Sequence, residues 1–154
     1  MPRLLHVEND PLVARALARL LRIHGYDVQT VLSYASGTLI TEKFDIGLFD
    51  IDLGDGDGVE LAEQLQAKNL IKTTLFFTAR TDTDTAARAS LLGPVISKTA
   101  EIDVVLEALR AVAAGGLPRG STTRRAVDDE DEPTSSSGDQ YATGTIKRAG
   151  QRSA

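Results

Sequence analysis

Short apolar runs alternate with amphipathic segments five times in residues 1–114, and this alternation limits the fold more than any other feature. Each apolar run has the length of a strand, and each following segment has the spacing of a helix with one buried face. Strands are predicted at 3–7, 26–31, 44–50, 73–77 and 94–97, and helices at 11–23, 33–43, 59–67, 81–92 and 101–114. Such alternation favours a parallel sheet with right-handed crossovers. We therefore expect a doubly wound α/β domain.

The composition is that of ordinary globular material. The 154 residues are 42% hydrophobic and 25% charged, and the net charge of −5 argues against broad binding to a nucleic acid backbone. The chain has no cysteine and two histidines, which excludes disulfides and thiolate metal sites and disfavours a multi-histidine zinc site. No apolar run approaches the roughly 20 residues that span a membrane, and the N-terminus lacks a signal-peptide pattern. We expect a cytoplasmic protein without membrane contact.

Polar side chains are predicted where the strands end. Open α/β sheets bind ligands beyond the carboxyl ends of their strands. Four of the predicted strands lead into Glu8-Asn9, Asp50, Thr78 and Lys98. Each of these residues alone is an ordinary strand-end or surface residue. Their convergence from four strands on one edge of one sheet is a much more specific signal.

This group of side chains has the chemistry of a phosphoryl-accepting pocket. A carboxylate such as Asp50 can attack phosphorus and form an acyl phosphate. The attack places negative charge on the phosphoryl oxygens, and Mg²⁺ bound by carboxylates and phosphate oxygens is the usual counter-charge. Glu8 is near enough to contribute to a metal site. Lys98 and Thr78 would contact phosphoryl oxygens.

Residues 3–114, about three quarters of the chain, resemble the receiver domain of two-component response regulators. The resemblance rests on an acidic cluster after the first strand, a strand-end Asp with a Gly eight residues later, a Thr-Ala pair and a lysine. These motifs are Glu8 to Pro11, Asp50, Gly58, Thr78-Ala79 and Lys98. The resemblance implies a flavodoxin-like or CheY-like parallel sheet of strand order 2-1-3-4-5.

The resemblance also implies a role for each site residue. Asp50 would accept a phosphoryl group from a sensor histidine kinase or a phosphotransfer protein, and Mg²⁺ would be required. The implied metal ligands are Glu8, Asn9, Asp50 and the backbone carbonyl of Asp52. Thr78 and Lys98 would sense the phosphoryl group and shift the face formed by the fourth helix, fifth strand and fifth helix. A downstream protein would bind that face.

Four positions depart from the family pattern, among them Gly54, which replaces a usual proline. Asn9 replaces a carboxylate that usually contacts the metal, which should weaken Mg²⁺ binding, although the amide oxygen can still be a ligand. Val95 stands where the family favours an aromatic switch residue. Thr99 follows Lys98 in place of a proline, so we expect a trans bond there. These departures keep a second interpretation open, a degenerate receiver that binds partners without phosphate.

Part of this pattern also occurs in a different class of protein, a family of phosphatases. Asp50-Ile51-Asp52 resembles the Asp-x-Asp motif of haloacid-dehalogenase-type phosphatases, in which the second Asp is the general acid. Here the motif lies on the third strand rather than near the N-terminus, and the acidic pair Asp128-Asp129 lies in a polar tail. A calcium loop at 52–58 lacks a bidentate Glu at the required offset. A receiver, unlike a phosphatase, is not expected to act as an enzyme with repeated turnover.

The composition changes at residue 115. Residues 115–154 are rich in Gly, Ser, Thr and charge and hold six Lys/Arg and six Asp/Glu, so the acidic excess lies in residues 1–114. We expect residues 1–114 to form the receiver domain and 115–154 a disordered tail, because this composition buries too little apolar surface. The tail is too short and polar for a DNA-binding output domain. We expect a single-domain regulator that acts through protein contact, and the sequence leaves open whether it forms a homodimer.

Overall fold

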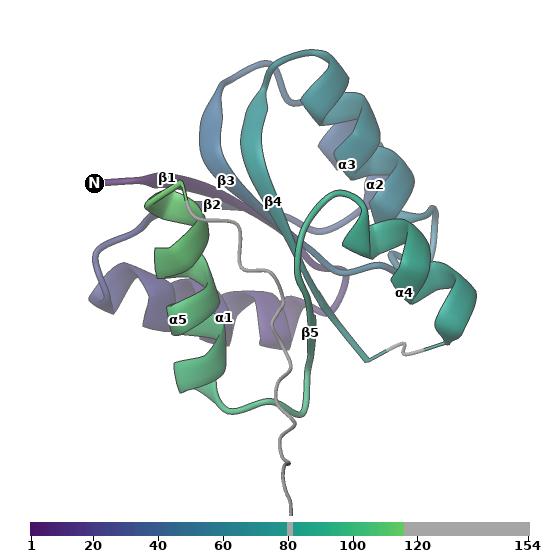
Figure 1. The fold of residues 1–154 in the computed structure, drawn as a ribbon. Coiled ribbons are helices and arrows are strands. Elements are labelled where there is room, and N and C mark those ends of the chain that lie inside the picture. The colour runs from purple at the N-terminus through teal and green to yellow at the C-terminus, as the bar shows by residue number, and fades with distance from the viewer. Residues whose placement is uncertain (80–81, 116–154) are drawn as a thin grey trace, which may run out of the picture. The chain divides into compact units, whose positions relative to one another are not determined.

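The computed structural model describes residues 1–79 and 82–115, in which strands and helices alternate as predicted (Figure 1). In chain order the elements are β1 Arg3–Val7, α1 Pro11–Ile23, β2 Asp27–Val31, α2 Tyr34–Thr38, β3 Phe44–Phe49, α3 Gly58–Ala67, β4 Ile71–Thr78, α4 Thr83–Ser90, β5 Val95–Ser97 and α5 Ile102–Ala113. The predicted tail falls almost wholly on residues 116–154, which lie outside the described residues, so that prediction stays a prediction.

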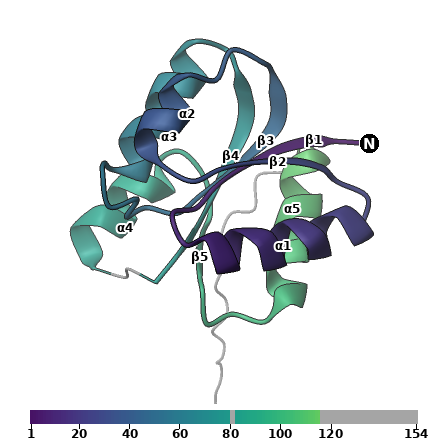
Figure 2. The ribbon, with the colours of Figure 1, turned by 180° about the vertical axis from the view of Figure 1, so that it is seen from behind.

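The five strands form one parallel sheet of order β2-β1-β3-β4-β5. Helices α1 and α5 cover one face, and α2, α3 and α4 lie on the other, as the two views in Figures 1 and 2 show. This arrangement confirms the doubly wound α/β fold and the strand order that the resemblance implied. Strand β2 lies on one side of β1 in the sheet, and β3 lies on the other side. The strand order therefore reverses between β1 and β3.

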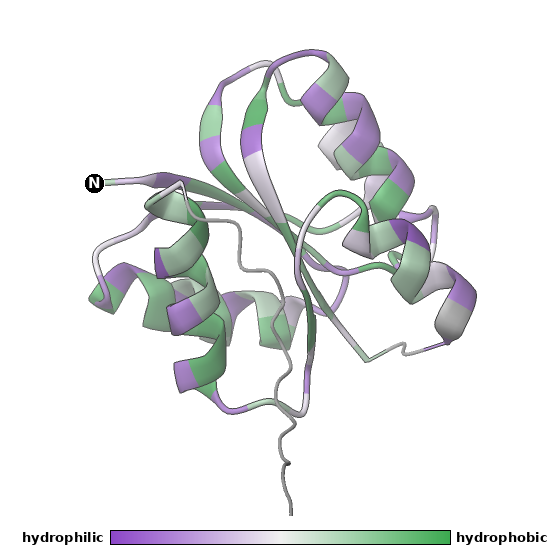
Figure 3. Ribbon diagram, in the orientation of Figure 1, coloured by the Kyte–Doolittle hydropathy of each residue, from purple (hydrophilic) through white to green (hydrophobic). Residues whose placement is uncertain are grey.

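Each face of the sheet has its own apolar core, because successive strand residues point to opposite faces. Leu4 and Leu48 pack with α1 and α5, while Leu5 and Phe49 pack with α3. Hydrophilic and hydrophobic positions alternate along the helices in Figure 3, as expected for helices that bury one side. The sheet is therefore buried on both faces, and its strand ends provide the edge for a binding site.

The start of α1 follows the predicted pattern. Asp10 caps the helix, since its Oδ1 accepts the backbone N–H of Leu12 at 3.0 Å and of Val13 at 3.5 Å. Pro11 occupies the first helical position, where its missing N–H costs nothing. With its side chain occupied at the helix terminus, Asp10 does not replace the carboxylate that is missing at position 9.

Several element boundaries differ from the prediction; β4, for example, begins at Ile71 rather than at residue 73. Helix α2 ends at Thr38 rather than residue 43, and within it Gly37 packs so closely on Leu61 of α3 that a Cβ would collide with the leucine side chain. Helix α4 begins at Thr83 rather than residue 81. Strand β3 ends at Phe49, which makes Asp50 the first residue beyond the strand. The shift of one residue keeps Asp50 at the strand end.

Gly58 fixes the distance between Asp50 and α3. Its N–H donates to the backbone carbonyl of Ile51 at 2.7 Å, and a Cβ at this position would collide with the backbone carbonyl of Asp50. The glycine is therefore required for close approach, and a side chain here would push the strand end and the helix apart.

We predict that Gly58→Ala lowers the free energy of unfolding by about 1–3 kcal/mol, because the added methyl group overpacks a rigid backbone contact. Urea denaturation followed by circular dichroism measures this loss. Gly93→Ala is the comparator, since its Cβ would meet the backbone carbonyl of Thr74. Both variants should lose stability, but only Gly58→Ala should shift the amide NMR signal of Asp50. Wild-type stability for Gly58→Ala would contradict the packing argument.

Candidate functional site

The polar side chains predicted at the strand ends lie along the C-terminal edge of the sheet. Glu8 follows β1, Asp50 follows β3, Thr78 is the last residue of β4, and Lys98 follows β5. These four strands are neighbours in the sheet. Glu8 and Asp50 flank the point where the strand order reverses, which is where doubly wound folds bind their ligands.

The Lys98 side chain bridges the two carboxylates. Its Nζ lies 2.7 Å from Oε1 of Glu8 and 2.9 Å from Oδ2 of Asp50. Glu8 is fully buried and Asp50 is 6% exposed, while the lysine side chain is 21% exposed. The structure thus brings three of the four predicted residues into contact. Thr78 is fully buried on the neighbouring strand, and its carbonyl accepts the backbone N–H of Lys98 at 2.9 Å.

The three charges perturb one another. Burial raises the pKa of Glu8, although its contacts with Lys98 and the backbone N–H of Asp10 act in the opposite direction. Burial alone would lower the pKa of Lys98, but the hydrogen bonds to Glu8 and Asp50 outweigh it, so the pKa of Lys98 is raised. The lysine is therefore held as a cation between two acids.

His6 lies in β1, two residues before Glu8. It is 1% exposed, and burial together with the nearby charge of Lys98 lowers its pKa to about 4. The imidazole is consequently neutral at physiological pH. Its Nδ1 has no hydrogen-bond partner within the described residues. His6 therefore adds no positive charge to the site.

Residues 50–57, here called the acceptor segment, fold through hydrogen bonds of their own. Oδ1 of Asp50 accepts the backbone N–H of Asp52 at 3.3 Å, and Oδ1 of Asp52 accepts that of Gly54 at 3.1 Å. Gly54 has a φ of 81°, a conformation that glycine adopts at little cost. These contacts turn the chain sharply away from the strand end.

Two backbone hydrogen bonds close the acceptor segment against the start of α3. The N–H of Leu53 donates to Gly56 at 3.1 Å, and that of Gly58 donates to Ile51 at 2.7 Å. Neither bond uses the backbone carbonyl of Asp52, which the resemblance implies as a metal ligand.

Asp55 links the acceptor segment to α2. Its two carboxylate oxygens accept the backbone N–H groups of Tyr34 at 2.8 Å and Ala35 at 3.0 Å, which lie at the start of that helix. These two hydrogen bonds lower the pKa of Asp55. No local sequence pattern indicates this contact, because the partners of Asp55 lie 20 and 21 residues away.

Asp57 also has a structural partner on each side. Its Oδ1 accepts the backbone N–H of Val59 at 2.8 Å and caps α3, and its Oδ2 accepts a hydrogen bond from Arg88 of α4 at 2.8 Å. Asp57 is not among the site residues predicted from the sequence. The spacing from Asp57 to Glu60 is typical of a helix start and could have identified the cap. Nothing local in the sequence indicates the contact with Arg88.

The candidate metal ligands supply oxygen atoms, which suits Mg²⁺. They comprise the carboxylates of Glu8 and Asp50, the amide of Asn9 and the backbone carbonyl of Asp52. Asn9 is exposed and lies beside the acceptor segment, with its Nδ2 3.4 Å from where a Cβ of Gly54 would be. Over residues 1–79 and 82–115, no three Asp, Glu, His or Cys side chains gather into a metal site.

The Lys98 ammonium lies in contact with both carboxylates that would hold the metal. The charge of Lys98 therefore partly compensates the negative charge of Glu8 and Asp50. The residues therefore fit a magnesium ion chemically, with one carboxylate fewer than the family pattern and a lysine already paired with the remaining two.

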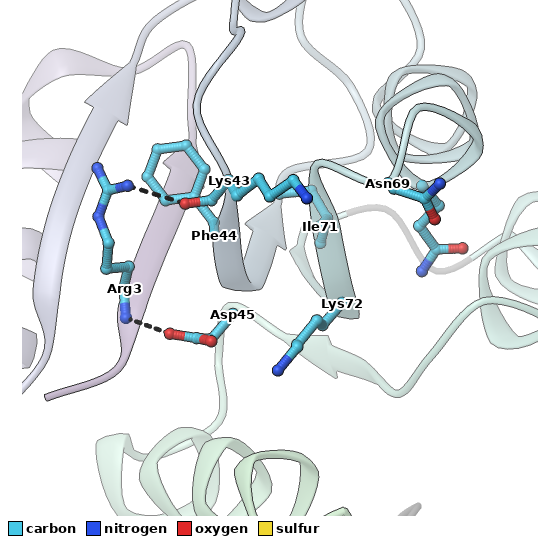
Figure 4. A pocket seen from close by; sticks show the side chains of 8 residues that line it. Arg3, Lys43, Phe44, Asp45, Asn69, Ile71 and Lys72 are labelled. Atoms are coloured by element: carbon cyan, nitrogen blue, oxygen red, sulfur yellow. Dashed lines mark hydrogen bonds between the residues drawn. The ribbon is translucent and has the colours of Figure 1, made fainter.

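A hollow of about 720 Å³ lies at the opposite edge of the sheet, where the strands begin (Figure 4). Arg3 lies over the ring of Phe44 at 4.6 Å, and its guanidinium donates to the backbone carbonyl of Lys43 at 2.9 Å. The backbone N–H of Arg3 donates to Asp45 at 2.8 Å. These polar groups pair with one another, so the contacts tie β1 to β3 and form no reactive cluster.

The fold and the strand-end residues together define a class of protein, parallel α/β domains with a buried acid and a lysine at the edge where the strand order reverses. A family model for the response regulator receiver domain matches residues 4–110. The chain belongs to this family. Receiver domains are the signalling modules of two-component systems. In the described part of the chain, no helix has the length and apolar character needed to cross a membrane.

Individual relatives agree with this assignment. The acid tolerance regulatory protein ActR of Sinorhizobium medicae is 30% identical over 110 residues, which cover 69% of this chain and 57% of that protein. The non-phosphorylated HemR receiver domain of Leptospira biflexa is 28% identical with a TM-score of 0.65, covering 82% of this chain and 100% of that domain. The response regulator TrrA of Thermotoga maritima, solved with Mg(2+)-BeF, is 19% identical with a TM-score of 0.66 over 73% of this chain and 99% of that one.

We predict that Asp55→Ala destabilises the protein at pH 7 and that the difference from wild type disappears in acid. The pKa of Asp55 is lowered in the folded state, so its ionised form contributes stability above the ordinary value of 3.8. That contribution is lost as the pH falls through the lower folded-state value. Urea midpoints measured from pH 7 to pH 2 test this. Glu107→Ala, which removes an exposed acid of α5, is the control. A pH-independent difference would argue against a charge-dependent cap.

Proposed function

We propose that this protein is a phosphorylatable receiver in which Asp50 accepts a phosphoryl group from a sensor histidine kinase or a phosphotransfer protein. The observation that carries the proposal is the position of Asp50 at the reversal of strand order, in contact with Lys98 at 2.9 Å. The lysine keeps a positive charge beside the carboxylate where negative charge would build up. The proposal adds no second catalytic group, so the domain would act as a signalling module rather than as an enzyme.

In the proposed reaction, a carboxylate oxygen of Asp50 attacks the phosphorus of a phosphohistidine. An O–P bond forms as the N–P bond breaks, and the donor imidazole leaves with the electron pair of that bond. Mg²⁺, when bound, would supply the positive charge that offsets the phosphoryl oxygens. Glu8, Asn9, Asp50 and the backbone carbonyl of Asp52 would hold it. Asp50 is oriented for this role by the backbone bond from its N–H to Val7 at 2.8 Å.

Lys98 and Thr78 would respond to the new phosphoryl group. The ammonium of Lys98 already contacts Asp50 and would transfer its contact to a phosphoryl oxygen. Thr78, at the end of β4, would donate its hydroxyl to another oxygen. Both residues precede segments that lead to α4 and α5, so a change at the site has a short covalent path to the proposed output face.

The proposed output is contact with a downstream protein on the face of α4, β5 and α5. Val95 at the start of β5 is half-buried and packs against the core beneath α3 and α4. An aromatic rotamer switch is thus not available at this position. The Lys98–Thr99 bond is trans, as expected without proline. The acidic net charge favours a protein partner over direct nucleic acid contact.

A degenerate receiver is the second candidate, and one observation favours it. Asn9 leaves two carboxylates at the metal site, and Lys98 contacts both of them. Weak Mg²⁺ binding would leave Asp50 without the charge that phosphoryl transfer needs. In that case the fold would serve as a phosphate-independent binding module.

We predict that incubation with acetyl phosphate and Mg²⁺ produces one phosphoryl adduct and that Asp50→Asn abolishes it, because the amide cannot act as the nucleophile. Intact-mass spectrometry measures the adduct, and omission of Mg²⁺ should suppress it. Asp103→Asn removes an exposed acid on α5 and should keep the adduct. An undiminished adduct in Asp50→Asn would sink the assignment of the site. A folded wild type without any adduct would favour the degenerate receiver.

We predict that Asn9→Asp tightens Mg²⁺ binding by about tenfold, because it adds a carboxylate close to the cation. Isothermal titration calorimetry measures the dissociation constant. Asn69→Asp adds the same charge at an exposed position between α3 and β4 and should leave the constant unchanged. Equal affinity in wild type and Asn9→Asp would show that position 9 does not contact the metal.

A further inference from the structure

We propose that the ion pair between Asp57 and Arg88 restrains α4 in the unphosphorylated protein, and that phosphoryl uptake moves α4 against this restraint. The inference rests on the proposed function of Asp50 for its second half only. Its first half concerns the free protein and is tested without phosphate.

The contact itself is well formed. Arg88 Nη1 donates to Asp57 Oδ2 at 2.8 Å, and the two side chains are 48% and 35% exposed. They lie 31 residues apart and join α4 to the start of α3. Glu60 and Glu63 of α3 add to the negative potential around the guanidinium, and with Asp57 they raise the pKa of Arg88. The acidic side of α3 therefore attracts α4.

Asp57 is the last residue of the acceptor segment and links it to two helices. Its Oδ1 caps α3 through the N–H of Val59, so both carboxylate oxygens are engaged in different helices. The next residue, Gly58, donates its N–H to Ile51 and packs against the backbone carbonyl of Asp50. A displacement of the Asp50 backbone thus reaches Asp57 through the neighbouring Ile51, its hydrogen bond with Gly58 and the peptide bond between Asp57 and Gly58.

Helix α4 has little apolar burial to hold it in place. Among its described side chains, residues 84–90, Ala89 is the only buried one. By comparison, α1 and α5 each bury four residues and α3 buries five. Burial of the single methyl group of Ala89 contributes little to the stability of α4. A polar contact is therefore more important for holding α4 in place than for holding α1, α3 or α5.

This restraint gives the protein a second link between the acceptor segment and α4. Val95 cannot act as an aromatic switch residue, so the link through β5 is altered. An ion pair on the surface contributes modestly, which suits a restraint that must be overcome when the domain switches. A phosphoryl group shifts the equilibrium between the restrained and the displaced position of α4 only by its difference in affinity for these two states. Weakening the restraint should therefore make switching easier.

Hydrogen exchange of the unphosphorylated protein tests the first half. Arg88→Gln removes the positive charge and keeps a polar, unbranched side chain, and Asp57→Asn retains a residue that can cap α3. Each single variant should raise the rate of amide exchange in residues 84–92 by about two- to fivefold. The double variant should exchange at about the same rate as the single variants, because all three variants lose the same contact. Arg19→Gln, on the exposed side of α1, is the control and should leave α4 unchanged.

Binding of beryllofluoride with Mg²⁺, as a phosphoryl analogue at Asp50, tests the second half. Arg88→Gln should bind it about two- to fivefold more tightly than wild type, because switching no longer breaks the ion pair. Wild-type exchange in α4 in both single variants would overturn the restraint. Equal beryllofluoride affinity would overturn its coupling to Asp50. No binding in any protein, with faster exchange retained, would instead overturn the proposed function and leave the restraint supported.

Discussion

The rest of the site depends on the contact of one lysine with two buried acids. An ionised carboxylate is costly to remove from water unless a partner compensates for it, and Glu8 is fully buried while Asp50 is nearly so. Lys98 supplies that compensation from a third strand, so it holds β1, β3 and β5 to a common geometry at the strand ends. The charge arrangement that stabilises the resting fold is therefore the same one that a phosphoryl group would rearrange.

The run of acids after β3 looks uniform in the sequence, but each acid has a different function in the structure. Asp50 contacts Lys98, Asp52 turns the chain, Asp55 caps α2, and Asp57 caps α3 and binds α4. The acceptor segment is thus connected to three helices as well as to the sheet. Its high charge density contributes to the internal structure of the domain and not only to a solvated turn or a metal site.

The alternating elements could be predicted because the spacing of hydrophobic residues is a local property of the sequence. The strand-end residues could be predicted because a parallel sheet brings the ends of its strands to one edge. The strand order came from the family resemblance rather than from the pattern. Helix α2 was predicted too long, and the packing of Gly37 against Leu61 is a tertiary contact that no local pattern shows. The contact of Asp55 with α2 and that of Asp57 with Arg88 were not predicted for the same reason, since each partner is brought close only by tertiary packing.

Helix α2 has five residues, too few for a helix to persist by its own propensity. The acceptor of its first backbone N–H groups is Asp55, a side chain that belongs to another loop. In addition, the Tyr34 hydroxyl accepts a hydrogen bond from Gln64 of α3 at 2.7 Å. Opening of the first turn of α2 would therefore break both hydrogen bonds to Asp55, so this helix depends on a side chain from the acceptor segment for its start.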